Sequence, residues 1–90
     1  MLVKVAPDVL MQELEEEVVL LDMKGGRYFG MDEVGTSVWK SLSEDGDVEA
    51  AIRAVESEYD ADAATIRQDV TELVQALLDA ELVLPADASA

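Results

Sequence analysis

The chain has 90 residues, 50% of them apolar, which predicts one folded domain with a single modest core. It contains no cysteine and no histidine, which excludes a thiolate nucleophile, an imidazole base and a zinc or iron site built on these residues. Its 21 acidic and 6 basic residues give a net charge of −15, which disfavours nucleic acid and anionic membranes as partners. The acidic residues are spread along nearly every segment, as on a solvated surface, so we predict a binding protein that is not an enzyme and uses no metal or cofactor.

The apolar residues do not form a membrane segment. No apolar run approaches the roughly 18 residues that span a bilayer, and no basic segment precedes a short apolar one as in a signal peptide. We therefore expect a cytoplasmic protein. The negative charge favours a basic or neutral peptide, or a basic patch on another protein, as the partner. It is equally compatible with a role in solubility alone, and the sequence leaves this open.

The first part of the chain predicts strands. Residues 1–6 alternate weakly between apolar and polar and predict a short edge or lead strand, which Pro7 ends. Residues 9–14 are compatible with an extended segment or with a turn. Residues 18–23, which begin with a continuous apolar run, predict a central strand covered on one face by helices.

A β-hairpin is predicted around the Gly-Gly pair. Residues 24–26 supply the positive φ angles of a tight turn, and residues 27–31 form the return strand. Because side chains alternate along a strand, Phe29 and Met31 share one face and Tyr28 and Gly30 the other. If Met31 enters the core, Tyr28 points away from it. Gly30 leaves the strand without a side chain, at a place where another backbone can come close.

Three helices follow, each marked by an apolar stripe with helical spacing. Asp32 and Asp47 predict N-caps, and Gly46 predicts the end of the first helix. The stripes are Val34, Val38 and Leu42, with Trp39 in the core; then Val48, Ala51, Ile52, Val55 and Tyr59; then Ile66, Val70, Leu73, Val74, Leu77 and Leu78. Residues 82–84 are expected to pack back as a short extended end, so that residues 1–84 form the domain and residues 85–90 a frayed tail.

Strands followed by helices predict an α+β domain of winged-helix-like outline, with a small antiparallel sheet of three strands, including the hairpin, before three helices. The order of the segments YFGMD, VGTSVW, DVEAAIRAVESEYDAD and RQDVTELVQALLDAELV, within residues 15–84, resembles the PqqD-like family. Members of this family, also called RiPP recognition elements, bind the leader segment of a ribosomally made precursor peptide for its modifying enzymes.

The resemblance also implies a binding site. In the family, the leader adds as an antiparallel strand to the last strand of the hairpin and lies in a cleft beside the last helix. Carried over to this chain, the implied site residues are Arg27, Tyr28, Phe29, Gly30 and Met31 on the strand, and Asp69, Val70, Leu73, Ala76 and Leu77 on the helix. For Val70 and Leu77 taken alone, core packing is the favoured role. From the pattern alone, the strand edge either accepts an added strand or only stays short and charged, which protects it from aggregation.

Either edge of the apolar stripe on the third helix could face the peptide. We predict the edge with two alanines, because they leave room for peptide side chains and Asp69 adds a polar acceptor. The two edges are Asp69, Leu73, Ala76 and Ala80 on one side, and Arg67, Val74 and Leu78 on the other.

Within the family, the small size, the acidic and alanine-rich composition and the GTSVW start of the first helix resemble the separate leader-binding proteins of lasso-peptide clusters. Those proteins deliver the precursor to a leader peptidase and a cyclase. A PqqD proper, which serves a radical-SAM enzyme, is the alternative with the same mechanism. Two more distant alternatives fit less well.

A winged-helix DNA-binding regulator should carry basic residues on its third helix, where this chain has Arg67 alone among several acidic residues. An acyl carrier protein should carry a phosphopantetheine-bearing serine, usually in Asp-Ser-Leu, and this chain has no such tripeptide. The Gly-Gly hairpin is also foreign to an all-helical bundle.

Overall fold

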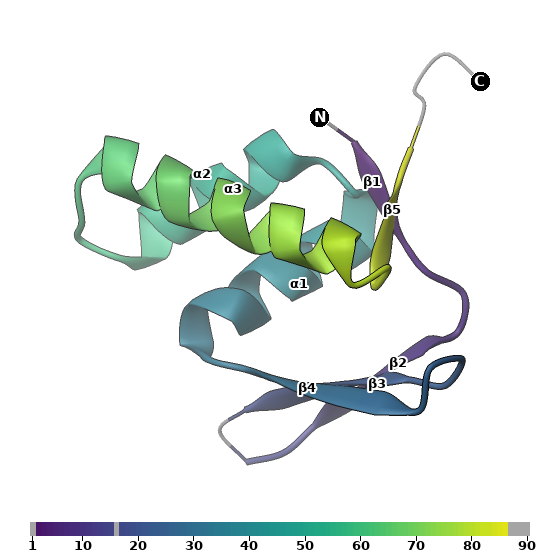
Figure 1. Ribbon diagram of the computed structural model, residues 1–90. Coiled ribbons are helices and arrows are strands. Elements are labelled where there is room, and N and C mark those ends of the chain that lie inside the picture. The colour runs from purple at the N-terminus through teal and green to yellow at the C-terminus, as the bar shows by residue number, and fades with distance from the viewer. Residues whose placement is uncertain (1, 16, 87–90) are drawn as a thin grey trace.

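The structure, a computed structural model, describes residues 2–15 and 17–86 (Figure 1). The described residues form two antiparallel sheets and three helices, so the predicted α+β class is confirmed. The strands are β1 (Val3–Val5), β2 (Val9–Glu13), β3 (Val18–Asp22), β4 (Arg27–Met31) and β5 (Val83–Pro85). The helices are α1 (Glu33–Asp45), α2 (Val48–Glu58) and α3 (Ala63–Asp79).

The larger sheet has the strand order β2-β3-β4, with β3 in the centre as predicted. Val18 and Leu20 of β3 are buried, whereas Val19 and Leu21 on the opposite face are half-buried. One face of the sheet therefore packs under the helices, while no described element covers the other (Figure 1). Residues 9–13, which the sequence left undecided, form β2 and pair with β3 along its whole length.

The turn between β3 and β4 differs from the prediction. Only Gly26, rather than all of residues 24–26, has a positive φ, of 68°. Gly25 is needed for space instead, because a Cβ atom there would lie 2.7 Å from Oδ2 of Asp22. The Asp22 carboxylate accepts hydrogen bonds from the backbone N–H groups of Lys24 and Gly25, at 3.2 and 3.1 Å, and so stabilises the turn.

The lead strand does not join the hairpin sheet, which takes β2 as its third strand. Instead, β1 pairs with β5 in a separate two-stranded sheet. Pairing between residues so far apart leaves no local sequence signal. Pro85, predicted to begin the tail, is the last residue of β5, and the Ala86 N–H donates to the Leu2 carbonyl at 2.9 Å. The predicted tail residues 87–90 lie outside the described residues.

Each helix begins at an aspartate whose carboxylate accepts a hydrogen bond from a backbone N–H of the first turn. Gly46 ends α1, as predicted, in the left-handed conformation with a φ of 70°. Its carbonyl accepts a hydrogen bond from the Val3 N–H at 2.8 Å, so the junction between α1 and α2 also holds β1. The capping aspartates are Asp32 for α1, Asp47 for α2 and Asp62 for α3.

One core joins the helices to both sheets. Trp39 of α1 is 2% exposed and lies in this core, as predicted. Leu20 enters the core from the three-stranded sheet, and Val3 and Val83 enter it from the β1–β5 pair. The helices therefore pack over one face of the larger sheet, with the β1–β5 pair beside them (Figure 1). Their contact with the larger sheet includes β4, its last strand.

We predict that Gly46→Ala destabilises the protein more than Gly26→Ala. Both glycines have a positive φ, which costs an alanine roughly 1–2 kcal/mol. In addition, a Cβ at Gly46 would collide with the Val3 carbonyl oxygen, whereas a Cβ at Gly26 meets no atom within 4 Å. Chemical denaturation measures both losses. Equal losses would contradict the close approach of β1 to the helix junction.

Candidate functional site

One edge of β4 pairs with β3, and the opposite edge pairs with no other described strand. In an antiparallel sheet each residue directs its N–H and C=O groups to the same side, and consecutive residues alternate. The Leu14 N–H donates to the Glu17 carbonyl at 2.8 Å, and the Met23 N–H donates to the Asp8 carbonyl at 2.9 Å. These two bonds show the phase of the hydrogen-bond ladder between β2 and β3, that is, which alternate residues of β3 direct their main-chain groups toward β2.

The phase decides which main-chain groups of β4 are free. Val19 and Leu21 bond to β2, so the other residues of β3 bond to β4. The register then directs the main-chain groups of Phe29 into the sheet. Tyr28 and Gly30 direct theirs outward, so the free edge presents their N–H and C=O groups to an incoming strand.

The outer face of β4 is open at Tyr28 and Gly30. A Cβ atom placed on Gly30 would meet no atom within 4 Å, and Tyr28 is 76% exposed. Both residues lie on the outer face of the sheet, whereas Phe29 and Met31 pack against the core from the inner face. No described side chain therefore covers the outer face of β4 at Gly30.

Arg27 connects the start of β4 to the end of α3. Its guanidinium donates to the Ala80 carbonyl at 3.1 Å and to the Asp22 carboxylate at 3.0 Å, and it lies 5.3 Å from the centroid of the Phe29 ring. A cation at this position interacts favourably with the last carbonyl groups of a helix. The contact places the C-terminal end of α3 beside the first residue of β4.

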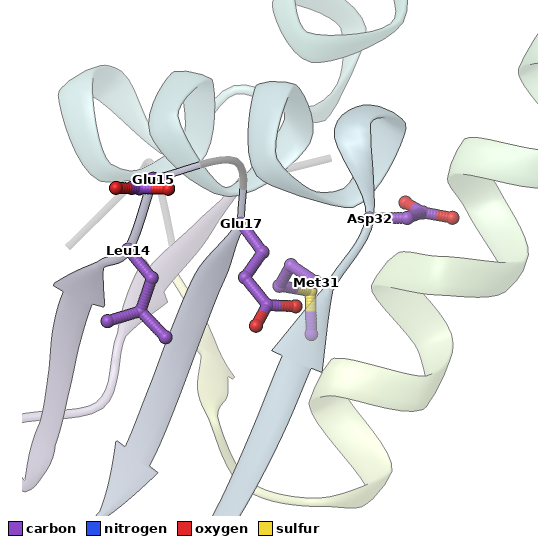
Figure 2. Close-up of a pocket in the computed structure, with 5 residues that line it drawn as sticks. All are labelled: Leu14, Glu15, Glu17, Met31 and Asp32. Carbon is purple, nitrogen blue, oxygen red and sulfur yellow. The ribbon is translucent and has the colours of Figure 1, made fainter.

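A groove lies between the other end of β4, the start of α1 and α3. Figure 2 shows the side chain of Asp32, which follows β4 directly, pointing toward α3. α3 therefore forms a wall beside β4, tied to the strand by Arg27 at one end and separated from it by the groove at the other. The residues that line this groove are Asp32, Val34, Gly35, Asp69, Glu72 and Leu73.

The predicted edge of α3 lies on the β4 side. Asp69 and Leu73 line the groove, and Ala80 accepts the hydrogen bond from Arg27. Ala76 is exposed on the same edge of the helix. These positions, together with the free edge of β4, bring most of the predicted site residues into one region.

The remaining predicted positions lie elsewhere. Val70 and Leu77 are 0% and 2% exposed, which agrees with the role in core packing that the sequence favoured for them. The opposite edge of α3 faces α2: Arg67 donates to the Glu49 carboxylate at 2.8 Å, and Val74 lines a groove with residues of α2. That edge does not face β4.

Four groove residues were not identified from the sequence: Asp32, Val34, Gly35 and Glu72. Asp32 was assigned to helix capping, which it performs by accepting a hydrogen bond from the Gly35 N–H at 2.7 Å. Two local signals existed. Asp32 follows the proposed pairing strand directly, and Glu72 lies three residues after Asp69 on the same helix face. Neither signal indicates that α3 lies beside β4.

A second hollow borders the end of β4 on the side of the β2–β3 turn. Met31 and Asp32 line it together with Leu14, Glu15 and Glu17 (Figure 2). Carboxylates therefore surround the end of β4, whereas its first residue is the cation Arg27. The charge along the free edge therefore changes from positive at the start of β4 to negative at its end.

Arg27 forms an ion pair with Asp22. The backbone N–H of Gly25 and then the guanidinium of Arg27 lower the pKa of the Asp22 carboxyl below its ordinary value. Asp22 therefore stays ionised at neutral pH and orients Arg27 toward α3. One pair thus closes the turn and positions the wall of the site.

The described part of the chain shows neither a metal centre nor a membrane-spanning helix. It contains no group of three or more residues arranged as metal ligands. None of its helices combines the length and the apolar character needed to cross a bilayer.

The sequence profile described as "Coenzyme PQQ synthesis protein D (PqqD)" matches residues 17–83. The chain belongs to the PqqD family. The match includes β3, β4 and all three helices, and so covers both the free strand edge and the helical wall. No protein of curated function matches the sequence.

Two solved structures are similar over almost the whole chain. "TbiB1 in Complex with the TbiA(beta) Leader Peptide" is 35% identical, with a TM-score of 0.86, covering 93% of this chain and 99% of TbiB1. "Lasso peptide synthetase B1 complexed with the leader peptide" is 20% identical, with a TM-score of 0.84, covering 94% of this chain and 100% of that one. The second similarity supports the fold alone.

We predict that Asp22→Asn lowers the free energy of unfolding at neutral pH and that this difference shrinks as the pH falls below 3.8. The folded-state pKa of Asp22 is lowered from 3.8, so its stabilising effect is present above that value and is lost as the pH falls through the lowered pKa. Urea denaturation across this range measures the effect, with the exposed Asp60→Asn as the control. A difference that persists unchanged in acid would contradict the role assigned to the Asp22 charge.

Proposed function

We propose that this protein binds the leader segment of a ribosomally synthesised precursor peptide and presents it to the leader peptidase and cyclase of lasso-peptide biosynthesis. The proposal rests mainly on the free edge of β4, where the outward main-chain groups of Tyr28 and Gly30 lie beside the wall of α3. The 35% identity to TbiB1, solved in complex with the TbiA(beta) leader peptide, supports the same function here. The peptide adds to β4 as a strand.

Main-chain pairing alone gives little selectivity. The N–H and C=O groups of two outward residues offer up to four hydrogen bonds, each worth about 0.5–1.5 kcal/mol net. Ordering the peptide opposes much of this gain, and every sequence offers the same backbone. Affinity and choice therefore come from peptide side chains that enter the space between β4 and α3, where Leu73 supplies apolar surface.

In this proposal the protein contributes binding and not catalysis. It acts in the cytoplasm, where a ribosomally made precursor is released, and it raises the concentration of that precursor at separate enzymes. Delivery to a radical-SAM enzyme, as expected of a PqqD proper, is the alternative within the same binding mechanism. The likeness to TbiB1 favours the lasso-peptide branch.

The direct test is a fluorescence-polarisation titration against labelled leader peptides encoded by short open reading frames beside the gene, with the TbiA(beta) leader as a reference probe. Saturable binding of a neighbouring leader supports the proposal. Loss of precursor processing by the partner peptidase when this protein is omitted separates presentation from binding. If no neighbouring leader binds even at high protein concentration, leader binding is not the function.

We predict that Gly30→Pro abolishes leader binding and that Gly30→Ala leaves it almost unchanged. Proline removes the outward N–H and places its ring where the peptide would pair, without removing a hydrogen bond between β3 and β4. Alanine keeps the N–H, and its Cβ meets no atom within 4 Å. Titration of both variants, checked for folding by circular dichroism, measures the effect. Undiminished binding by the proline variant would rule out pairing at this edge.

We also predict that Leu73→Ala weakens leader binding by about 1–2 kcal/mol, or roughly tenfold, whereas Leu78→Ala does not. Both leucines are half-buried on α3 and pack against the core, so their truncation affects stability similarly. Only Leu73 lines the groove beside β4. Titration and thermal unfolding of the two variants separate binding from folding. An equal loss of affinity would place the peptide away from this groove.

A further inference from the structure

The register of β4 determines which peptide residues would point toward α3. Residues directly opposite each other in neighbouring strands place their side chains on the same face of the sheet, in parallel and antiparallel pairs alike. Peptide residues opposite Phe29 and Met31 therefore point to the inner face, and those opposite Tyr28 and Gly30 point to the outer face. The side chain opposite Met31 lies nearest the groove that follows β4.

The groove is acidic. Its lining contains three carboxylates, from Asp32, Asp69 and Glu72, and no basic residue. Asp32 also caps α1, and the helix N-terminus offsets part of its charge. Asp69 and Glu72 lie one turn apart in the middle of α3, away from either helix end. They are therefore the main sources of negative potential on the α3 wall.

Three of the six basic residues are engaged with carboxylates elsewhere, and none of the six lines the groove. Arg27 contacts Asp22 and the end of α3, and Arg67 contacts Glu49 on the side of α2. Lys40 forms an ion pair with Glu13. The second hollow at the end of β4 adds Glu15 and Glu17 on the opposite side. A cation in the groove would thus meet attraction from both directions.

The same groove also offers apolar surface. Val34 and Leu73 are half-buried and line it between the carboxylates. Long basic side chains bury their methylene groups on such surfaces while the charged head stays near water and anions. A glutamate or aspartate of the peptide would instead face three like charges. The combination of apolar walls and carboxylate rim matches lysine or arginine.

We infer that this groove selects leader peptides that place a lysine or arginine opposite Met31. The inference rests on the proposed function, since it specifies the peptide class that adds to β4. Asp69 and Glu72 are the specificity-determining residues, and Leu73 and Val34 hold the aliphatic stem. In this groove the negative charge of the protein selects a particular peptide residue, in addition to attracting basic partners in general.

The test begins with a display library of short peptides randomised at every position and selected on the wild-type protein. Peptides whose binding is lost in Gly30→Pro are kept, because these use the β4 edge. We expect lysine or arginine to be enriched at one position of this set. We expect selection on the double variant Asp69→Asn/Glu72→Gln to lose that enrichment while still yielding peptides that need Gly30.

A double-mutant cycle then measures the contact. In the best selected peptide, lysine is replaced by norleucine, which keeps the aliphatic stem and removes the charge. We expect this change to weaken binding about fivefold to the wild-type protein and hardly at all to Asp69→Asn/Glu72→Gln. The control, Glu44→Gln/Glu56→Gln, removes the same net charge at exposed positions of α1 and α2 that do not line the groove, and should retain the fivefold effect.

The outcomes distinguish the two claims. Peptides that depend on Gly30 but show no basic position, or a lysine effect that both double variants reduce equally, would overturn the groove inference and leave strand addition intact. If selection yields no peptide that depends on Gly30, both strand addition and the inference that rests on it are wrong.

Discussion

The free edge of β4 depends on where the chain goes after α3. A strand that follows the last helix could have paired with β4 and closed the sheet. Instead, β5 pairs with β1, with Val83 buried in the core and the register running from Val3 opposite Pro85 to Val5 opposite Val83. Gly46 holds β1 from the other side through its carbonyl. The β1–β5 pair thus holds the first and the last described strand away from the hairpin, and the outward main-chain groups of Tyr28 and Gly30 pair with no described strand.

The wall beside that edge depends on the same arrangement. β5 begins shortly after α3 ends, so its pairing with β1 also holds that end of the helix in place. There the Ala80 carbonyl meets Arg27, whose orientation is held by Asp22 and the β3–β4 turn. The strand and the helix are thus joined at one end by a charged contact and separated at the other by an open groove. A peptide-binding surface arises between elements that are far apart in the sequence.

The two ends of this surface carry opposite charges. A net charge of −15 attracts basic partners from solution, and the carboxylates of the protein also repel one another. Salt screens both interactions over about 10 Å. General attraction does not distinguish one basic peptide from another. The contrast between Arg27 at the start of β4 and Asp32, Asp69 and Glu72 near its end operates within the site and at short range, where it can distinguish the order of charges along a peptide.

The sequence alone determined those features that arise from neighbouring residues. Asp32 and Asp47 as N-caps, Gly46 as the end of α1, the 18–22 and 27–31 hairpin and Trp39 in the core all follow from local hydrogen bonding, turn geometry or the periodicity of apolar side chains. The family resemblance added the strand edge and one side of the last helix as the site. It was the tertiary structure that decided the pairing of β1 with β5, the strand conformation of residues 9–13 and the acidic groove of Asp32 and Glu72. These features depend on which separate segments lie side by side, and the spacing of residues within one segment does not predict that arrangement.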